Sequence, residues 1–152
     1  MKRIALLYLL ILTSFMSYAQ NNNPNYDAEL AASLEADDYG MKNYVFVILK
    51  TGSNKNDNED LRNNAFRGHM SNISRLVEDD KLVVAGPFGK NDLTYRGLFI
   101  LKVTTIEEAE KLLETDPAIK GRYLDAELIE WYGSAALSQY LLDSDKVWKI
   151  KP

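Results

Sequence analysis

The middle of the chain carries four segments with the apolar patterns of β-strands. Two of them, YVFVIL (44–49) and GLFIL (97–101), are unbroken apolar runs, as is typical of strands covered on both faces. A third, KLVVAG (81–86), is β-branched and must end at Pro87, which fixes φ and has no amide hydrogen to donate. The fourth, YLDAELIEWYG (123–133), alternates between faces. Its two faces carry Leu124, Ala126 and Leu128 on one side and Ile129 with Trp131 on the other.

The segment between YVFVIL (44–49) and KLVVAG (81–86) has the period of an amphipathic helix and starts near Glu59. Either Asp57 or Asn58 is expected to cap it. His69, the only histidine in the sequence, lies within or at the edge of the apolar stripe and is expected to face the protein. At about 100° per residue, the stripe consists of Phe66, Met70, Ile73 and Val77, widened by Ala65 and Leu76, while Asn72, Ser74, Glu78 and Asp79 point elsewhere.

A second helix is expected after the GLFIL strand (97–101). Thr105 and Glu108 have the spacing of a capping box at its start. Asp116 precedes Pro117, and because the residue before a proline avoids the α-helical region, the helix is expected to end or change direction there. An aspartate in such a position commonly accepts hydrogen bonds from nearby backbone amides.

The predicted order of elements is β-α-β-β-α-β. This order indicates an α+β, ferredoxin-like fold, in which a four-stranded antiparallel sheet carries two helices on one face. The two unbroken runs are expected to lie side by side at its centre. The other face needs a cover, and a second copy of the chain is the economical one, so a homodimer of the dimeric α/β-barrel type is expected. Residues 134–152 are expected to help cover that face or to clasp the partner.

The beginning of the chain has the pattern of a secretory signal peptide over residues 1–19. Lys2 and Arg3 precede an apolar run, and Ser17 to Ala19 fit a cleavage site. The run is short for a membrane span, although an uncleaved anchor is the alternative. The mature protein is therefore expected to be periplasmic or secreted, with no membrane attachment. The expected organisation beyond it is a linker with a short helix (20–40), one domain (41–133) and a C-terminal extension (134–152).

Composition narrows the classes of function. The chain has 152 residues, a net charge of −4 and 46% hydrophobic residues, which suits a single globular domain. Because no Lys/Arg cluster is present and the balance is acidic, nucleic acid is an unfavourable partner. The sequence has no cysteine, which excludes disulfides, thiolate catalysis and cysteine lipidation. With one histidine as well, no metal site and no cofactor are expected.

The candidate chemistry gathers around the helix with the histidine and the turn after the short strand. A histidine can change charge near neutral pH, but a single one on an apolar face is more often a core residue. Gly86 can adopt a positive φ or let a ligand approach the backbone. Phe88 is expected near the mouth of any cavity that the sheet forms, or else as an ordinary aromatic residue of the turn.

Taken together, these pieces resemble the YCII-related (YciI-like) family. The similarity spans about 42–132 and depends on the order of the histidine helix, KLVVAGPFG, GLFIL, TDPAIKGR and ELIEWYG. With the signal peptide and the lead-in YDAELAASLEADDYGMK, the chain looks like the secreted members of Bacteroidetes-type bacteria. The resemblance implies a dimeric ferredoxin-like fold with a site in a cleft.

The resemblance also implies which residues form that site, namely His69 and Asp116 as a catalytic pair. Many relatives carry an arginine three residues before the histidine, where this chain has Phe66, so Arg62, two turns earlier on the same face, is the candidate for substrate contact. A neighbouring carboxylate would orient the imidazole and make it a usable general acid or base. The remaining candidate pocket residues are Gly86, Pro87, Phe88 and Trp131, for which packing in the core or a dimer interface is the alternative.

Three functions stay open from the sequence. In the first, His69 moves a proton on a small polar substrate, aromatic ones included, in an elimination or a hydrolysis, with Asp116 orienting it and Phe88 lining the cleft. In the second, the same cleft binds a small ligand without catalysis. In the third, the chain is a secreted assembly module that acts through the uncovered face of the sheet.

Overall fold

The computed structural model describes residues 23–149. The expected signal peptide (1–19) and the last three residues of the extension lie outside the described residues. The chain divides into two units at Leu30 and Ala31, and the second unit contains the strands of the sheet. At the junction, the short helix α2 (Ala28–Ser33) is capped by Asp27, whose carboxylate accepts the amide hydrogen of Leu30 at 2.9 Å. None of the helices described is both long and apolar enough to span a membrane.

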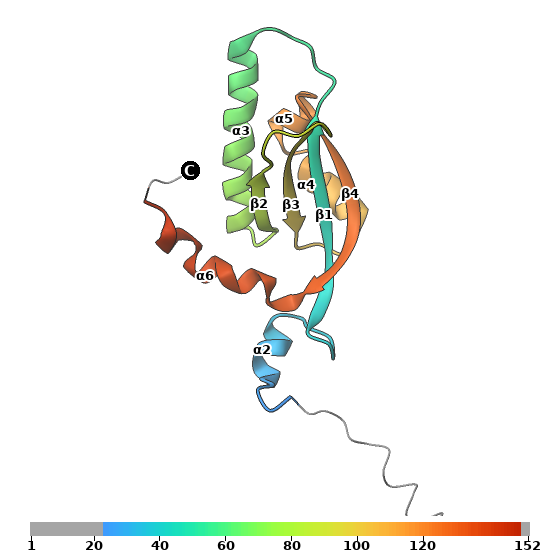
Figure 1. The fold of residues 1–152 in the computed structure, drawn as a ribbon, viewed down its shortest axis with the longest axis vertical. Helices are drawn as coiled ribbons and strands as arrows, with labels where there is room; N and C mark the ends of the chain where they lie inside the picture. Colours follow the sequence, from blue (N-terminus) through green and yellow to red (C-terminus); the bar gives the residue numbers. More distant parts are fainter. Residues whose placement is uncertain (1–22, 150–152) are drawn as a thin grey trace, which may run out of the picture. The chain divides into compact units, whose positions relative to one another are not determined.

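One antiparallel sheet organises the second unit (Figure 1). The two unbroken apolar runs pair at its centre, from Val45 opposite Leu101 to Leu49 opposite Gly97. The prediction of an α+β, ferredoxin-like fold with a four-stranded antiparallel sheet is confirmed, because the strand order is β2-β3-β1-β4 with every neighbouring pair antiparallel. The strands are β1 (Met41–Thr51), β2 (Leu82–Pro87), β3 (Tyr95–Leu101) and β4 (Leu124–Ser134).

Three of the helices lie over one face of this sheet (Figure 1). The long helix is α3 (Glu59–Glu78), and the shorter ones are α4 (Ile106–Leu113) and α5 (Pro117–Lys120). Side-chain oxygens of Asn58 and Thr105 cap α3 and α4 at 3.1 and 3.2 Å from backbone amides, so of the two expected caps of α3 it is Asn58 that serves. The main core between helices and sheet contains Val45, Val47, Leu49, Leu76, Leu82, Phe99, Leu101, Ala109, Leu113, Ala118 and Leu124.

The buried stripe of α3 differs from the predicted one. Met70 and Val77, expected inside, are 48% and 40% exposed, whereas Asn72, expected outside, is buried. The stripe is turned by about one residue, and Asn72 can be buried there because its amide oxygen accepts hydrogen bonds from Arg75 and Thr115, at 2.8 and 3.0 Å. The buried residues of α3 are Ala65, His69, Asn72 and Leu76.

The opposite face of the sheet is partly covered by the C-terminal extension. A second apolar cluster of Tyr44, Val83 and Ile100 lies on this face, and Leu137 packs against it. The hydroxyl of Tyr140 donates a hydrogen bond to the carbonyl oxygen of Val83, which fixes the extension to strand β2. Figure 1 shows the extension continuing directly from β4. It consists of the 3₁₀-helices η1 (Ala135–Tyr140) and η2 (Asp145–Val147) on either side of α6 (Leu141–Ser144).

Candidate active site

The histidine of α3 and the aspartate that precedes α5 form a buried pair. Nδ1 of His69 lies 2.6 Å from Oδ2 of Asp116, across 47 positions of sequence. Asp116 is 0% exposed and His69 is 9% exposed. An ionised carboxylate can only accept a hydrogen bond, so with Asp116 in that state Nδ1 is the donor and carries the ring hydrogen.

The second oxygen of Asp116 is also occupied. Oδ1 accepts the backbone amides of Ala118 and Ile119 at 2.9 and 3.4 Å, so Asp116 is the N-cap of α5, and Pro117 takes the first position of that helix. The two interpretations of Asp116 from sequence, a partner of the histidine and a local cap, therefore describe the two oxygens of one carboxylate. Because the cap fixes the plane of the carboxylate, it also fixes the direction in which Oδ2 points.

Close packing of α3 on α5 brings the pair within hydrogen-bond distance. Gly68 faces the ring of Pro117, and a Cβ atom added to Gly68 would lie 2.6 Å from Cγ of Pro117. Any side chain at this position would push the two helices apart. His69 and Asp116 are the chain neighbours of these two residues, so the small Gly68 is a condition for their hydrogen bond.

Aromatic rings hold the imidazole on its other sides. The His69 ring stacks on Phe99, with centroids 5.7 Å apart and planes at 22°, and it meets the Phe66 ring edge-on at 6.2 Å. Nε2 has no hydrogen-bond partner in residues 23–149. In this part of the chain the fully buried side-chain polar atom without a partner is Nδ2 of Asn72, so Nε2 of His69, in a side chain that is 11% exposed, keeps some contact with solvent. A ring with hydrogen on Nδ1 and a free Nε2 can accept a proton.

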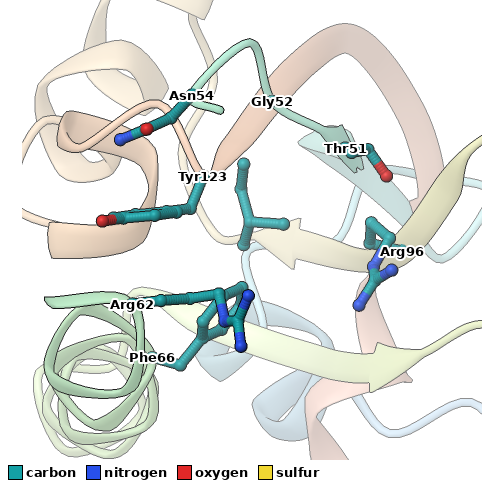
Figure 2. A pocket seen from close by; sticks show the side chains of 8 residues that line it. Thr51, Gly52, Asn54, Arg62, Phe66, Arg96 and Tyr123 are labelled. Atoms are coloured by element: carbon teal, nitrogen blue, oxygen red, sulfur yellow. The ribbon is translucent and has the colours of Figure 1, made fainter. Parts of the chain in front are cut away.

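A cavity of about 370 Å³ lies next to this pair, where β1 ends and β4 begins (Figure 2). His69 and Asp116 do not line it. Phe66 connects the two places, because its ring lines the cavity and also contacts the His69 ring. Figure 2 shows Phe66 and Arg62 extending from α3 and Tyr123 on the other side of the space. The lining consists of Thr51, Gly52, Asn54, Arg62, Phe66, Arg96, Tyr123 and Leu124.

Of the candidate pocket residues, Arg62 lines the cavity and those of the β2 turn do not. Phe88 packs on Tyr95 at 6.2 Å between ring centroids and is 38% exposed, and its backbone amide donates to the carbonyl of Arg96 at 2.9 Å. Gly86 has no positive φ, and a Cβ there would meet nothing within 4 Å. The turn of Gly86, Pro87 and Phe88 thus pairs with β3 beside the cavity instead of forming its wall.

Trp131 lies on the opposite face of the sheet. Its ring packs on Tyr44 and Phe46, with centroids 5.6 and 6.5 Å apart, in the cluster that the C-terminal extension covers. The expectation that Trp131 walls the same pocket as His69 is corrected by this placement. The physical reason is the alternation of β4, which sends Trp131 away from the side on which Leu124 and Leu128 meet the helices.

Sequence reasoning missed Arg96. The register between β1 and β3 shifts from Leu49 opposite Gly97 to Lys50 opposite Tyr95, so Arg96 is an extra residue in a β-bulge. A bulge changes the direction of a side chain, and Figure 2 shows Arg96 reaching into the cavity. Strict alternation of side chains along β3 would place Arg96 on the other face of the sheet. The neighbouring Gly97 was the one feature of the sequence that could have indicated a bulge.

Two further lining residues belong to a tight crossing of loops. A Cβ on Gly52 would lie 2.1 Å from the carbonyl oxygen of Arg122, so only glycine fits there. The side-chain amide of Asn54 donates a hydrogen bond to the carbonyl oxygen of Gly121 at 2.7 Å. These contacts fix Tyr123, whose ring contacts Phe66 at 6.3 Å. The chemistry of the lining is therefore two guanidinium groups beside two aromatic rings.

Comparisons with known proteins find similarity to a solved structure. No family model matches the chain, and no curated protein matches it. The solved structure is 5-chloro-2-hydroxyhydroquinone dehydrochlorinase from Burkholderia phenoliruptrix in complex with 2,5-dihydroxybenzoquinone. It is 19% identical, covers 57% of this chain and 92% of its own, and superimposes with a TM-score of 0.42. The fold class is therefore assigned from the strand order and pairing of the sheet.

The described residues contain no group of three or more His, Cys, Asp or Glu side chains placed to hold a metal ion. The acid–base groups that the structure brings together at this site are His69 and Asp116.

Proposed function

We propose that this protein is a small-molecule enzyme in which His69 transfers a proton and Asp116 orients it. The observation that carries this proposal is the arrangement of the Asp116 carboxylate, which caps α5 with one oxygen and accepts from Nδ1 of His69 with the other at 2.6 Å. For a histidine with a purely structural role in the core, hydrogen bonds to the ring nitrogens from any neighbouring groups would be sufficient. Here Nδ1 is held by a fully buried carboxylate, and Nε2 has no partner among the residues that the structure describes, which is the arrangement of an oriented general base.

The proton transfer takes place at Nε2. In an elimination, Nε2 accepts a proton from the substrate, the electrons of the broken bond to hydrogen form the new double bond, and the leaving group departs with its own electron pair. In a hydrolysis, Nε2 accepts a proton from a water molecule as the water oxygen forms a bond to the electrophilic atom of the substrate, and the bond from that atom to the leaving group breaks. In both, Asp116 stabilises the imidazolium that forms, and the ring returns its proton to the leaving group.

The substrate would lie in the 370 Å³ cavity and extend past Phe66 to the imidazole. The cavity is within the usual size of small-ligand sites, about 300–1,000 Å³. Proton transfer requires heavy atoms within about 3 Å. We therefore propose that the Phe66 ring, which touches both the cavity and His69, turns when the substrate binds.

A second candidate is a binding protein without catalysis. The observation in its favour is that the cavity is lined by Arg62, Phe66, Arg96 and Tyr123 and not by His69 or Asp116. In that case the pair would serve only to attach α5 to α3. Variants of His69 would then leave ligand binding unchanged and would remove no activity.

Turnover by His69 variants separates the two candidates. Purified protein is incubated with a panel of small polar aromatic and aliphatic compounds, and products are followed by NMR. For any compound converted, His69→Gln and Asp116→Asn should lower the rate by about 100-fold or more, the usual contribution of a positioned acid or base. Met70→Leu, on the exposed side of the same helix, is the matched control and should keep the rate. Equal rates in wild type and His69→Gln would overturn the proposal.

We further propose that the chain is a secreted, homodimeric member of the YciI-like family. The order of its motifs supports the family, and the pattern of residues 1–19 supports secretion. Ile129 remains 44% exposed on the sheet face that the C-terminal extension only partly covers, which supports a second copy there. Intact mass after expression in a bacterial host tests cleavage before Gln20, and light scattering tests the dimer. An uncleaved chain or a monomer at micromolar concentration would contradict the respective part.

A further inference from the structure

The cavity receives two guanidinium groups from different elements. Figure 2 shows Arg62, from α3, and Arg96, from β3, reaching into the same space. Two positive charges that face one cavity repel each other unless a negative charge joins them. An oxyanion that lies between them would accept hydrogen bonds from both forked side chains.

Neither arginine has a close carboxylate partner in the described part of the chain. In residues 23–149, no carboxylate lies within 4.0 Å of the Arg96 guanidinium. Arg62 has one ion pair, with Glu59 at 3.5 Å, and both side chains are largely exposed to water, so this pair contributes little. Other cations of the same domain are paired more closely, such as Lys50 with Glu127 at 2.7 Å. The cavity is thus a local positive site in a chain with a net charge of −4.

The backbone is arranged to place Arg96 at this site. Arg96 is the extra residue of the bulge between β1 and β3, and bulges are frequent beside functional sites, where they change the direction of a side chain. Next to it, a Cβ on Gly97 would lie 2.6 Å from the carbonyl oxygen of Gly86, so the strand passes this point only because residue 97 is glycine. The direction of Arg96 is therefore a property of the sheet and not of a mobile loop.

The other lining residues indicate what the anion is attached to. Phe66 and Tyr123 contact each other at 6.3 Å between centroids and form an aromatic wall next to the arginines. Small-ligand sites commonly combine such an apolar wall with a few polar groups that fix the orientation. Phe66 also touches His69, so a ligand held at its anionic end by the arginines would extend along this wall toward the imidazole.

We propose that the cavity binds a small aromatic or apolar molecule through an oxyanion, a carboxylate or a phosphate, held between Arg62 and Arg96. This assignment rests on the proposed function for the identity of the reacting end, but the binding of the anion does not depend on proton transfer. It names the substrate class as small organic acids or phosphate esters. Neutral compounds of the same shape should bind poorly.

Equilibrium binding of three probes to the full chain tests the proposal. Phenylacetate and phenyl phosphate carry the two anions, and phenylacetamide is the neutral match of the first. Phenylacetate or phenyl phosphate should bind at least about tenfold more tightly than the amide, because a hydrogen bond to a charged group is worth about 1.5–3 kcal/mol. Whichever of the two anions binds more tightly identifies the substrate class, organic acids or phosphate esters. Binding should weaken as salt is raised.

Charge-matched variants locate the site. Arg62→Gln and Arg96→Gln should each lower the affinity for the anion by about tenfold. Arg67→Gln removes the same charge from the outer side of α3, where Arg67 contacts Asn64, and should change the affinity less than about twofold. Equal binding of the amide and the acid, an unchanged affinity in Arg96→Gln, or no binding of either anion at about 10 mM would overturn the proposal.

The His69→Gln variant keeps the two proposals apart. Anion binding should be unchanged in it, since His69 does not line the cavity, even though turnover is lost. Loss of anion binding in the arginine variants together with unchanged turnover in His69→Gln would support the anion site and contradict the proton transfer. Unchanged anion binding in the arginine variants together with lost turnover in His69→Gln would contradict the anion site and support the proton transfer.

Discussion

Gly68 of α3 and Pro117 of α5 are packed so closely that a Cβ on Gly68 would lie 2.6 Å from Cγ of Pro117. The residues that follow Gly68 and precede Pro117 are His69 and Asp116, so this contact lies directly beside their 2.6 Å hydrogen bond. The geometry of the candidate site is therefore a consequence of helix packing, and it can be disturbed without altering either polar residue.

The first prediction concerns Gly68→Ala. The added methyl group should force the helices apart and lower the free energy of unfolding by roughly 1–2 kcal/mol, since overpacking costs about 1–3 kcal/mol and alanine returns up to about 1 kcal/mol of helix propensity. Urea denaturation measures the change. Gly89→Ala is the control, because a Cβ there meets nothing within 4 Å, and it should be neutral. A Gly68→Ala protein as stable as wild type would mean that α3 and α5 are not held this closely.

The second prediction concerns the ring hydrogen of His69. In Asp116→Asn, the amide oxygen can still cap Ala118, which leaves the amide NH₂ group facing Nδ1. The hydrogen of the neutral ring should then move from Nδ1 to Nε2, which removes the free acceptor. Because His69 is the only histidine, ¹⁵N NMR of one ring reports the change.

The matched control for that measurement is Asp125→Asn, which removes a carboxylate on β4 beside the exposed Arg122. Hydrogen on Nδ1 should persist in this variant as in wild type. If Asp116→Asn also kept its hydrogen on Nδ1, the buried carboxylate would not determine the tautomer, and its role would be reduced to capping.

The third prediction concerns Phe66, whose ring lies between the cavity and the imidazole edge. In Phe66→Ala, Nε2 of His69 should become more accessible, so diethyl pyrocarbonate should modify His69 several-fold faster. Mass spectrometry reads this at a single histidine. Phe88→Ala, which shortens an aromatic residue packed on Tyr95 outside the cavity lining, should leave the rate unchanged. Equal rates of modification in Phe66→Ala and wild type would mean that the Phe66 ring does not separate the imidazole from the cavity.

The fourth prediction is a pH dependence of the C-terminal extension. Burial raises the pKa of Tyr140 above the ordinary value of 10.0. Because the pKa is raised in the docked state, the stabilisation by Tyr140 is complete below about pH 10 and is lost as the pH rises through the raised value. A phenolate also cannot donate to the carbonyl of Val83. The extension should therefore detach in strong alkali.

Tryptophan fluorescence between about pH 8 and 12 follows this detachment through Trp148 in the extension. Tyr140→Phe should remove most of the transition. Burial, and to a lesser degree the charge of Glu35, also raises the pKa of Tyr44 in the same cluster, so a smaller transition should remain. An unchanged transition in Tyr140→Phe would show that another group controls the extension.

The sheet could be predicted from the sequence because its signals are local and strong. The runs 44–49 and 97–101 have no polar interruption, and they form the central pair of strands. The stripe of α3 was predicted one residue out of place, because periodicity ranks Met70 above Ala65 and cannot see the hydrogen bonds that allow Asn72 to be buried.

The candidate site depended on relations that the residues alone do not reveal. The proximity of His69 and Asp116 was expected from the family resemblance, whereas its cause, the contact of Gly68 with Pro117, has no sequence pattern. Arg96 was missed because a bulge reverses the face on which alternation would put it. The alternation of β4 had already placed Trp131 opposite the helix-facing residues, and assigning it to the pocket disregarded that signal.

The double use of Asp116 has a consequence for interpreting related sequences. One of its oxygens begins a helix, so a chain that had lost all chemistry would still be selected to retain this aspartate for folding. Retention of the acid in a distant homologue would then say little about whether that homologue is an enzyme. The imidazole caps no helix, so the histidine is the more informative marker of activity when sequences diverge.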